Sequence, residues 1–290
     1  MHHVADSPSD ALVWLITGCS TGLGRELTRM VLEHGYRAIV TAREPATIQD
    51  LVEGRDDQAL ALQLDVTDPA DVEGAVRAAE TRFGRIDVLV NNAGIGYFGA
   101  IEESEEAEVR RMFEVNVHGL SRMTRAVLPG MRTRRRGHIV NMSSVGGLRG
   151  SPGLGYYNAT KFAVVGFSEA LALEVEPLGI RVTIVEPSGF RTDWAGRSAR
   201  EAPNEIPDYA ATAGANTRSL RAWSGKQPGD PVRAARAIVQ AVASANPPLH
   251  LLLGRAALTR ATEKLDLMRQ DFQAWEETTL GADFPPDETG

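Results

Sequence analysis

The chain has little cysteine: among its 290 residues only Cys19 carries a thiol. An internal disulfide is therefore impossible, and secretion into an oxidising compartment gains no support. Long apolar runs are also missing, because no stretch approaches the ~20 residues that a membrane-spanning helix needs. The first ten residues, MHHVADSPSD, carry acids and lack the basic and apolar regions of a signal peptide. We therefore expect a flexible N-terminus over residues 1–10, no membrane span and a cytoplasmic location.

Basic charge is scarce as well. The chain has 31 Lys and Arg residues against 38 Asp and Glu residues, a net charge of -7. Its only dense basic run, over residues 132–136, has an ordinary structural interpretation, since cations near a helix end interact favourably with the helix dipole. Nucleic acid is accordingly not an expected partner. The six histidines are scattered without the spacing of ligands, so we predict no metal site.

Apolar residues make up 43% of the chain and charged residues 24%, which allows an ordinary buried core. Short apolar runs that are typical of buried strands occupy residues 11–17, 38–41, 59–64, 86–90, 138–142, 180–185 and 249–253. Helical patterns lie between and after them, at about residues 22–35, 46–53, 68–83, 105–128, 156–176, 231–242 and 256–272. This alternation predicts an α/β fold, a Rossmann-like doubly wound parallel sheet in three α/β/α layers.

The expected organisation is one Rossmann-fold domain over residues 11–255. From about residue 191 to 230 the pattern fades into polar sequence with Pro and Gly, which is typical of a functional loop, and we interpret it as a substrate loop. A C-terminal helix and tail follow over residues 256–290.

A glycine-rich loop, residues 17–24, lies between the first expected strand and the first expected helix. Its glycines, Gly18, Gly22 and Gly24, allow a tight turn and a close approach to a ligand, and the helix N-terminus offers free N–H groups to a pyrophosphate. Ser20 and Thr21 could donate hydroxyls to phosphate or could simply cap the helix. The spacing differs from the ordinary G-x-G-x-x-G, but the placement of the loop between a strand and a helix still favours nucleotide binding over a plain tight turn.

The second strand ends at Ala42-Arg43-Glu44, the place where a carboxylate would accept a hydrogen bond from an adenosine ribose. Ala42 is not acidic, whereas the guanidinium of Arg43 suits a 2'-phosphate. We therefore predict NADP(H) as the cofactor. NAD(H) stays possible, because a shift of register would make Glu44 the ribose ligand.

A catalytic pair is indicated by Tyr157 and Lys161, which lie four residues apart and so share one helical face. A neighbouring cation favours the phenolate form of a tyrosine, which is otherwise a poor proton-transfer group at neutral pH. A strand over residues 138–142 ends in Ser143 and Ser144, and either hydroxyl could hold a carbonyl oxygen or belong to an ordinary turn. A hydroxyl donor beside a phenol would polarise a ketone and protonate the alkoxide formed by hydride transfer.

Two asparagine positions add to this pattern. Asn116 falls on the apolar stripe of the helix expected over residues 105–128, so its amide must find partners inside the fold. It could bond its neighbours, or interrupt the helix and anchor a water near Lys161. The small residues of Asn91-Asn92-Ala93-Gly94, after the fourth strand, would let a cofactor lie against backbone, although a plain polar turn explains them equally.

Together these segments resemble the short-chain dehydrogenase/reductase family in its common single-domain type. The resemblance runs from about Leu12 to Thr192 and includes Thr17 to Gly24, Asp65, Asn91 to Gly94, Asn116, Ser144, Tyr157, Lys161 and Pro187 to Gly189. It implies that Tyr157 is the acid/base, that Ser144 rather than Ser143 positions the substrate, that Lys161 binds the nicotinamide ribose and lowers the tyrosine pKa, and that Asn116 supports a proton relay. Together with Arg43, the implied cofactor contacts are Gly18, Ser20, Thr21, Gly22, Leu23, Gly24, Asp65, Val66, Asn92, Ala93, Gly94, Tyr157, Lys161, Pro187, Gly189 and Thr192.

The expected function is hydride transfer between NADP(H) and a carbonyl or secondary alcohol. Apolar residues near the strand ends, among them Tyr97, Phe98 and Leu154, favour a lipophilic substrate, although they could equally belong to the core or to an interface. The candidate substrate contacts are Ser144, Gly96, Leu148, Phe190 and Trp194. The resemblance also implies a homodimer or homotetramer assembled through the long helices. The alternatives are a non-catalytic dinucleotide sensor or scaffold, which would not need Ser144, Tyr157 and Lys161, and a lyase or epimerase on the same fold.

Overall fold

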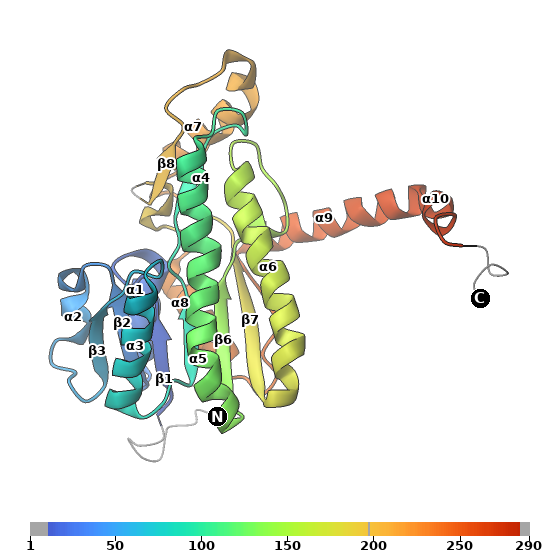
Figure 1. Cartoon of the computed structure of the whole chain (residues 1–290). Helices are drawn as coiled ribbons and strands as arrows, with labels where there is room; N and C mark the ends of the chain where they lie inside the picture. Colours follow the sequence, from blue (N-terminus) through green and yellow to red (C-terminus); the bar gives the residue numbers. More distant parts are fainter. Residues whose placement is uncertain (1–10, 197, 285–290) are drawn as a thin grey trace.

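Seven parallel strands form the central sheet, in the order β3-β2-β1-β4-β6-β7-β9 (Figure 1). The computed structural model describes residues 11–196 and 198–284, so the N-terminus expected to be flexible, residues 1–10, lies outside the described residues. The strands are β1 (Val13–Ile16), β2 (Arg37–Ala42), β3 (Ala59–Gln63), β4 (Val88–Asn91), β6 (Gly137–Met142), β7 (Ile180–Pro187) and β9 (His250–Leu253). Each corresponds to one of the predicted apolar runs, and the predicted doubly wound parallel sheet is confirmed.

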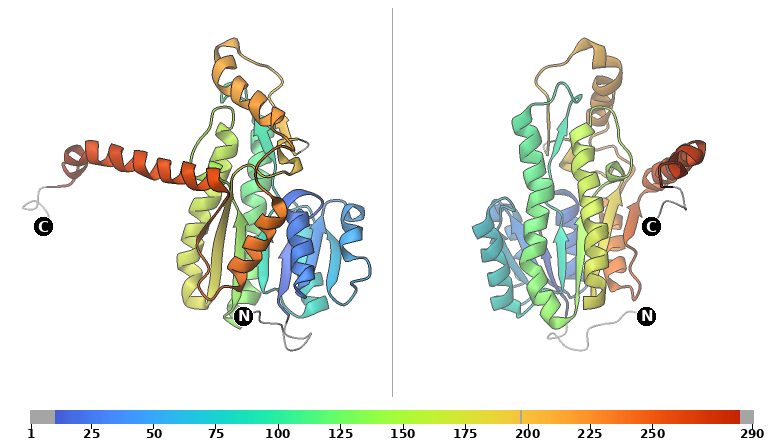
Figure 2. Two further views of the ribbon diagram at one scale, coloured as in Figure 1. Left: turned by 180° about the vertical axis from the view of Figure 1, so that it is seen from behind. Right: turned by 45° about the vertical axis from the view of Figure 1, so that its right-hand side comes forward.

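Helices cover both faces of the sheet, which gives the three predicted layers (Figures 1 and 2). Alternate residues of β1 point to opposite faces: Trp14 and Ile16 pack with one set of helices, and Val13 and Leu15 with the other. The first layer contains α1 (Gly22–Glu33) and α8 (Pro231–Ala243). The second contains α3 (Pro69–Phe83), α5 (Leu120–Arg134) and α6 (Gly155–Val175).

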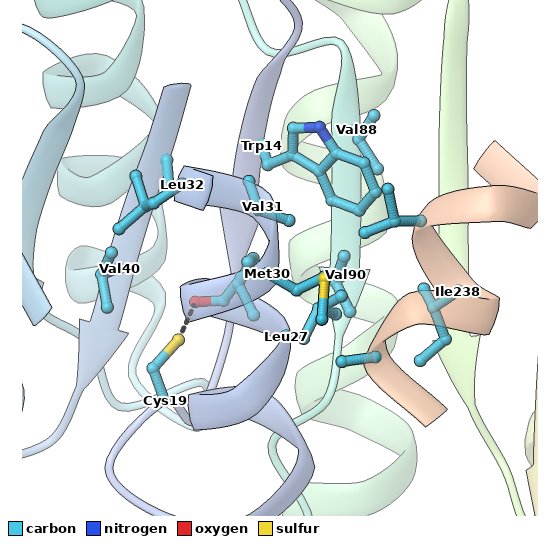
Figure 3. Packing of buried hydrophobic residues seen from close by; sticks show 14 of the residues in the cluster. Trp14, Cys19, Leu27, Met30, Val31, Leu32, Val40, Val88, Val90 and Ile238 are labelled. Atoms are coloured by element: carbon cyan, nitrogen blue, oxygen red, sulfur yellow. Dashed lines mark hydrogen bonds between the residues drawn. The ribbon is translucent and has the colours of Figure 1, made fainter. Parts of the chain in front are cut away.

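Figure 3 shows the core on the first of these faces. Trp14 is fully buried and lies above Met30 and Val31 of α1, close to Val88 of the neighbouring strand. Ile238 reaches the same cluster from α8, so one apolar body joins the sheet to both helices. This packing fixes the start of α1 at the carboxyl edge of β1, where the glycine loop lies.

Local sequence sets the beginnings of two helices in the same way. The Asp68 carboxylate accepts hydrogen bonds from the backbone N–H groups of Ala70 and Asp71, and Pro69 occupies the first turn of α3. Asp230 does the same for α8, ahead of Pro231. Asp-Pro therefore identifies both helix starts from sequence alone.

The helix predicted over residues 105–128 differs in two respects. It consists of α4 (Glu106–Phe113), a π-helical segment (Glu114–Gly119) and α5, which continues through Pro129 to Arg134. The π-helical turn contains Asn116, so the helix is interrupted at the residue whose amide needed partners.

The segment over residues 191–230 contains regular structure that its sequence pattern does not reveal. β8 (Ala199–Glu201) pairs in parallel with β5 (Gly96–Phe98), and α7 (Ala215–Ala222) follows. Three-residue strands are too short for an alternation of apolar and polar residues to be recognised in the sequence. β5 and β8 therefore form through tertiary contacts between distant parts of the chain.

The last part of the chain leaves the body of the molecule. α9 (Arg255–Ala274) projects away from the sheet and ends at the short helix α10 (Glu276–Leu280), as Figures 1 and 2 both show. Only Ala257 and Ala261 of α9 are buried. Among the described residues, no helix has the length and apolar character needed to cross a membrane.

Candidate active site

The predicted site residues follow the carboxyl ends of β1, β2, β3, β4, β6 and β7. Because the strands are parallel, these ends meet at one edge of the sheet. The chain also reverses its order there, since β2 and β3 lie on one side of β1 and β4 lies on the other. Ligands of open α/β sheets bind in the crevice outside such a point.

The glycine loop is tied to the turn after β4. Thr17 Oγ1 accepts hydrogen bonds from the backbone N–H groups of Asn92 (2.9 Å) and Ala93 (3.0 Å). In return, Asn92 Nδ2 donates to the carbonyls of Thr17 (2.8 Å) and Gly18 (2.9 Å). Gly18 adopts a positive φ of 70°, a conformation that glycine reaches without strain. The side-chain amide of Asn92 thus shapes the loop.

Cys19 lies in the same loop but points into the protein. Its thiol is buried and donates to the carbonyl of Ile16 at 3.1 Å (Figure 3). Burial raises the pKa of this thiol to about 11, so it stays protonated at neutral pH. Cys19 therefore helps to shape the loop and has none of the features of a reactive cysteine.

The N-terminus of α1 is open to an anion. Thr21, the N-cap residue, makes no side-chain capping bond, so the N–H groups of the first turn keep their capacity to donate. Thr192, from the segment after β7, approaches this turn: a Cβ built on Gly22 would lie 3.3 Å from the Thr192 Cβ. The loop after β7 therefore lies next to the glycine loop at the N-terminus of α1.

A cavity of about 600 Å³ continues this site beyond β2 and β3. Arg43, Asp65 and Val66 line it, together with Gly94 from the turn after β4. The Asp65 carboxylate accepts hydrogen bonds from the backbone N–H and hydroxyl of Thr67. Burial favours a higher pKa for Asp65, but these bonds and the charges of Arg43 and Arg111 outweigh it and lower the pKa below its usual value.

Asn116 joins the turn after β4 to α6. Its Oδ1 accepts a hydrogen bond from the Ile95 N–H (2.8 Å), and its Nδ2 donates to the Ile95 carbonyl (2.9 Å) and to Thr160 Oγ1 (3.2 Å). Gly94 lies beside it, because a Cβ there would stand 3.3 Å from Asn116 Oδ1 and 3.8 Å from Lys161 Nζ. A glycine at this place keeps the space between the amide and the ammonium open.

Ser144, Tyr157 and Lys161 form the centre of the site. Tyr157 and Lys161 lie on the first turns of α6, and the Lys161 ammonium is 5.8 Å from the centre of the Tyr157 ring. The Lys161 Nζ donates to the carbonyl of Met142 at 2.7 Å. Ser144 Oγ accepts the N–H of Gly146 (3.0 Å), the Ser144 hydroxyl donates to the carbonyl of Pro187 (3.5 Å), and it lies beside the phenol of Tyr157. Ser143 instead donates to the carbonyl of Lys161, which leaves Ser144 as the hydroxyl beside the phenol.

Burial controls the proton affinities at this centre. It raises the pKa of Tyr157 to about 12, and the neighbouring Ser144 hydroxyl offsets only part of that rise. Burial also lowers the pKa of Lys161 to about 8. The tyrosine pKa is therefore not lowered below its usual value, as the resemblance implied, because the effect of burial dominates. At neutral pH Tyr157 is a phenol beside a mostly charged lysine.

Aromatic and apolar side chains form a wall next to the phenol. The Trp194 ring lies 4.8 Å from the Tyr157 ring and 5.5 Å from the Phe98 ring, centre to centre. Gly96 leaves room for this indole, since a Cβ there would stand 3.0 Å from it. The cluster is completed by Tyr97, Met112, Leu154 and Ala199.

Two of the predicted substrate residues, Phe190 and Leu148, do not belong to this aromatic wall. Phe190 bridges to Gly229 and packs against the core beneath α8, so the structure does not bring it into the aromatic wall. It lines a separate cavity of about 630 Å³ with Leu253 and Gly254. Leu148 is half-buried at the end of the short turn after Ser144. Among the described residues, no group of three or more His, Cys, Asp and Glu side chains could hold a metal ion.

Arg221 of α7 is a site residue that sequence reasoning missed. Its Nη1 donates to the carbonyls of Ala195 (2.8 Å) and Gly196 (2.7 Å), and its Nη2 to the carbonyl of Ala199 (2.9 Å). The guanidinium also lies 4.9 Å from the Phe98 ring. Arg221 therefore holds the loop that carries Trp194. No local signal marks it, because its role depends on how residues 191–230 fold.

Comparison with known proteins supports the family. A family profile described as short chain dehydrogenase matches residues 12–203. The chain belongs to the short-chain dehydrogenase family. An oxidoreductase named BOA17 from Botryotinia fuckeliana is 39% identical over 93% of this chain and 98% of its own length. A 3-ketodihydrosphingosine reductase from Bacteroides thetaiotaomicron is 40% identical over 83% of this chain and 87% of its own length.

Solved structures agree with the fold and with the cofactor class. A short-chain dehydrogenase from Streptomyces avermitilis, 44% identical, matches 94% of this chain and 99% of its own with a TM-score of 0.89. A family member from Burkholderia phymatum in complex with NAD is 26% identical, with a TM-score of 0.78 over 90% of this chain and 96% of its own. ElxO, with NADP bound, is also 26% identical, with a TM-score of 0.71 over 86% of this chain and 99% of its own. The family is one of oxidoreductases that act on CH–OH and C=O groups with NAD or NADP.

Proposed function

We propose that this short-chain dehydrogenase is an NADP(H)-dependent oxidoreductase that interconverts a lipophilic ketone and its secondary alcohol. The observation that carries the proposal is the placement of the Ser144 hydroxyl beside the buried phenol of Tyr157, with the ammonium of Lys161 5.8 Å from the phenol ring. In acting as the acid/base, Tyr157 donates its proton to the substrate oxygen as negative charge develops there. Ser144 donates a second hydrogen bond to that oxygen. Lys161 then stabilises the phenolate that Tyr157 becomes.

The residues present fit a nicotinamide dinucleotide. The uncapped turn of α1 suits a pyrophosphate, and the cavity of about 600 Å³ between Asp65, Val66 and Gly94 suits an adenosine. When bound, such a cofactor supplies or accepts the hydride. Lys161 would hold its nicotinamide ribose, with Asn92, Ala93 and Gly94 on one side of it. Pro187, Gly189 and Thr192 would cover the nicotinamide from the loop after β7.

Arg43 supports NADP(H) over NAD(H). Its side chain is exposed at the rim of this cavity, and among the described residues it has no hydrogen-bond or ion-pair partner. The other two arginines of the cavity are already paired, Arg110 with Glu106 and Arg111 with Glu108. An unpaired guanidinium at this position can bind a 2'-phosphate through two hydrogen bonds.

Arg43→Ala is therefore expected to weaken NADPH binding by about 10-fold or more, since hydrogen bonds to charged groups contribute ~1.5–3 kcal/mol. NADH binding should change little. Fluorescence titration with both nucleotides measures the two dissociation constants, and Arg110→Ala provides a matched loss of one guanidinium from the same cavity. Tighter binding of NADH than of NADPH by the unaltered chain would contradict the assignment.

A lipophilic substrate is supported by the aromatic wall of Phe98, Leu154 and Trp194 beside Tyr157. It is also consistent with the relative that is named for reduction of 3-ketodihydrosphingosine. The test is consumption of NADPH, followed by its absorbance, against a panel of ketones and aldehydes of increasing chain length. Reduction of small hydrophilic carbonyls alone would contradict the substrate class. Nucleotide binding without any turnover would favour a sensor, a lyase or an epimerase.

Arg221→Ala should raise KM for a lipophilic ketone about 10-fold and change kcat less, because the loop with Trp194 loses three backbone contacts while Tyr157 and Lys161 stay in place. Steady-state kinetics separates the two constants. Arg218→Ala removes a guanidinium from the same helix and should leave KM unchanged, because within the part of the chain that the structure describes Arg218 bonds only the Ala210 carbonyl and Glu205. Equal effects of the two variants on KM would contradict a specific role for Arg221 in holding the loop that carries Trp194.

We also infer a cytoplasmic homo-oligomer. A single buried thiol fits a reducing compartment. On the outer face of α6, Phe162 and Leu173 are 44% and 76% exposed, which favours assembly through the long helices into a dimer or tetramer.

A further inference from the structure

The projecting helix α9 is anchored to the body only at its base. Ala257 and Ala261 are buried there, Arg260 Nη2 donates to Ser151 Oγ at 2.6 Å, and Arg149 forms an ion pair with Glu263. Beyond Glu263 the helix runs on into solvent for about three turns, through Ala274. A helix without tertiary packing is marginally stable in water, so this arm needs a covering partner.

Apolar side chains repeat along the arm at alternating spacings of three and four residues. This is the heptad pattern of a helix that pairs with another helix. The arm seam, as we name this stripe, consists of Leu258, Ala261, Leu265, Met268 and Phe272 of α9, together with Trp275, which follows directly after the helix ends. Leu258, Leu265, Phe272 and Trp275 are between 60% and 66% exposed, so most of the seam is uncovered in the single chain.

We propose that the arm seams of two copies of this chain pair as an antiparallel coiled coil. In that register Leu265 packs against the partner's Met268, at the centre of the exposed part of the arm. The partner's Phe272 lies beside Ala261, which is already buried against the body of its own chain, and the partner's Trp275 lies beyond the end of its α9, near Leu258.

Charges beside the seam select the antiparallel orientation. Lys264 then faces the partner's Asp271, a flanking pair of opposite sign. A parallel pair would bring Lys264 beside the partner's Arg269. That contact is between like charges and opposes parallel association.

The charge balance also favours a protein partner over a lipid surface. Residues 255–280 carry four basic and five acidic side chains. Helices that bind anionic membranes have a polar face rich in Lys and Arg, which this arm lacks. A second copy of the chain, by contrast, offers opposite charges to Lys264 and Asp271.

Pairing of this kind brings the tip of each arm to the base of the other. The base contacts Arg149 and Ser151, which lie in the segment that joins Ser144 to α6 and Tyr157. The partner's Trp275 would therefore lie beside the segment that borders the candidate active site. The assembly is independent of any contact made through α6.

The test is the molar mass of the full chain in solution, measured by size-exclusion chromatography with light scattering. Leu265→Glu places a charge in the seam and should halve the mass. Leu267→Glu is the matched control, because Leu267 is 49% exposed on the same helix but lies outside the seam. Asp271→Lys should also halve the mass, and adding Lys264→Asp to it should restore the mass by reversing the sign of each flanking pair.

An unchanged mass in Leu265→Glu, or equal dissociation by Leu265→Glu and Leu267→Glu, would overturn the proposal. Failure of Lys264→Asp to rescue Asp271→Lys would overturn the antiparallel register. Sedimentation with vesicles that contain phosphatidylserine tests whether the arm binds a membrane instead. That alternative predicts that the unaltered chain binds the vesicles, that Leu265→Glu abolishes this binding, and that Leu265→Glu leaves the molar mass in solution unchanged.

Discussion

Tyr157→Phe is expected to lower kcat for carbonyl reduction by roughly 100- to 10,000-fold, the range that general acid catalysis contributes. The phenol is a buried proton donor beside Ser144, and burial raises the pKa of Tyr157 to about 12, so the group holds its proton at neutral pH until the substrate oxygen becomes basic. Phe keeps the ring that packs against Trp194 but has no proton to give. Stopped-flow or steady-state absorbance of NADPH measures the loss.

Tyr156→Phe is the matched control for this prediction. It makes the same chemical change one residue earlier on α6, at a side chain that packs against the edge of the same aromatic cluster. Nucleotide binding should survive in both variants, because the hydroxyl of Tyr157 contributes little to holding the pyrophosphate. Retention of more than about a tenth of the activity by Tyr157→Phe would assign proton transfer to another group.

The sheet was predictable because its strands are buried on both faces. Such strands are nearly continuous apolar runs, and residues 138–142 or 180–185 can be recognised without any tertiary information. Asp68-Pro69 and Asp230-Pro231 likewise start their helices through purely local hydrogen bonds. Where local chemistry decides the structure, sequence and structure agree.

The segment over residues 191–230 was not predictable for the opposite reason. β8 exists only as the partner of β5, and α7 is a short polar helix with no fully buried residue. Arg221 acquires its three carbonyl acceptors only when this segment folds over Phe98. Its place beside the aromatic wall is therefore a property of the tertiary structure.

The candidate site shows the same division. The positions of Ser144, Tyr157 and Lys161 follow from strand ends and helical spacing, which sequence reveals. The role of Asn92 could not be predicted in this way. Its side-chain amide donates to the carbonyls of Thr17 and Gly18, so it supports the cofactor site by fixing the glycine loop. Hydrogen bonds between residues 74 and 75 positions apart leave no mark in a single sequence.

Gly24→Ala tests this tie and is expected to weaken nucleotide binding by at least about 10-fold and to lower the melting temperature. A Cβ on Gly24 would overlap the Asn92 amide nitrogen and stand 2.5 Å from the Gly18 carbonyl oxygen, the donor and the acceptor of one hydrogen bond in the loop. Both groups would have to move, and with them the turn that faces the pyrophosphate. Breaking one such bond and leaving its buried groups unpaired costs ~1–3 kcal/mol.

Gly74→Ala isolates the effect of the neighbours from that of the residue type. Gly74 lies within α3, as Gly24 lies within α1, but a Cβ at Gly74 meets no atom within 4 Å. Alanine is the better helix former by ~0.5–1 kcal/mol, so Gly74→Ala should stabilise the fold slightly and leave nucleotide affinity unchanged. A lower melting temperature for Gly24→Ala and a higher one for Gly74→Ala would show that the loss of stability arises from the contacts around Asn92 and not from the Gly-to-Ala change itself. If Gly24→Ala bound nucleotide as tightly as the unaltered chain, the glycine loop would be free to reshape, and Asn92 would not determine its form.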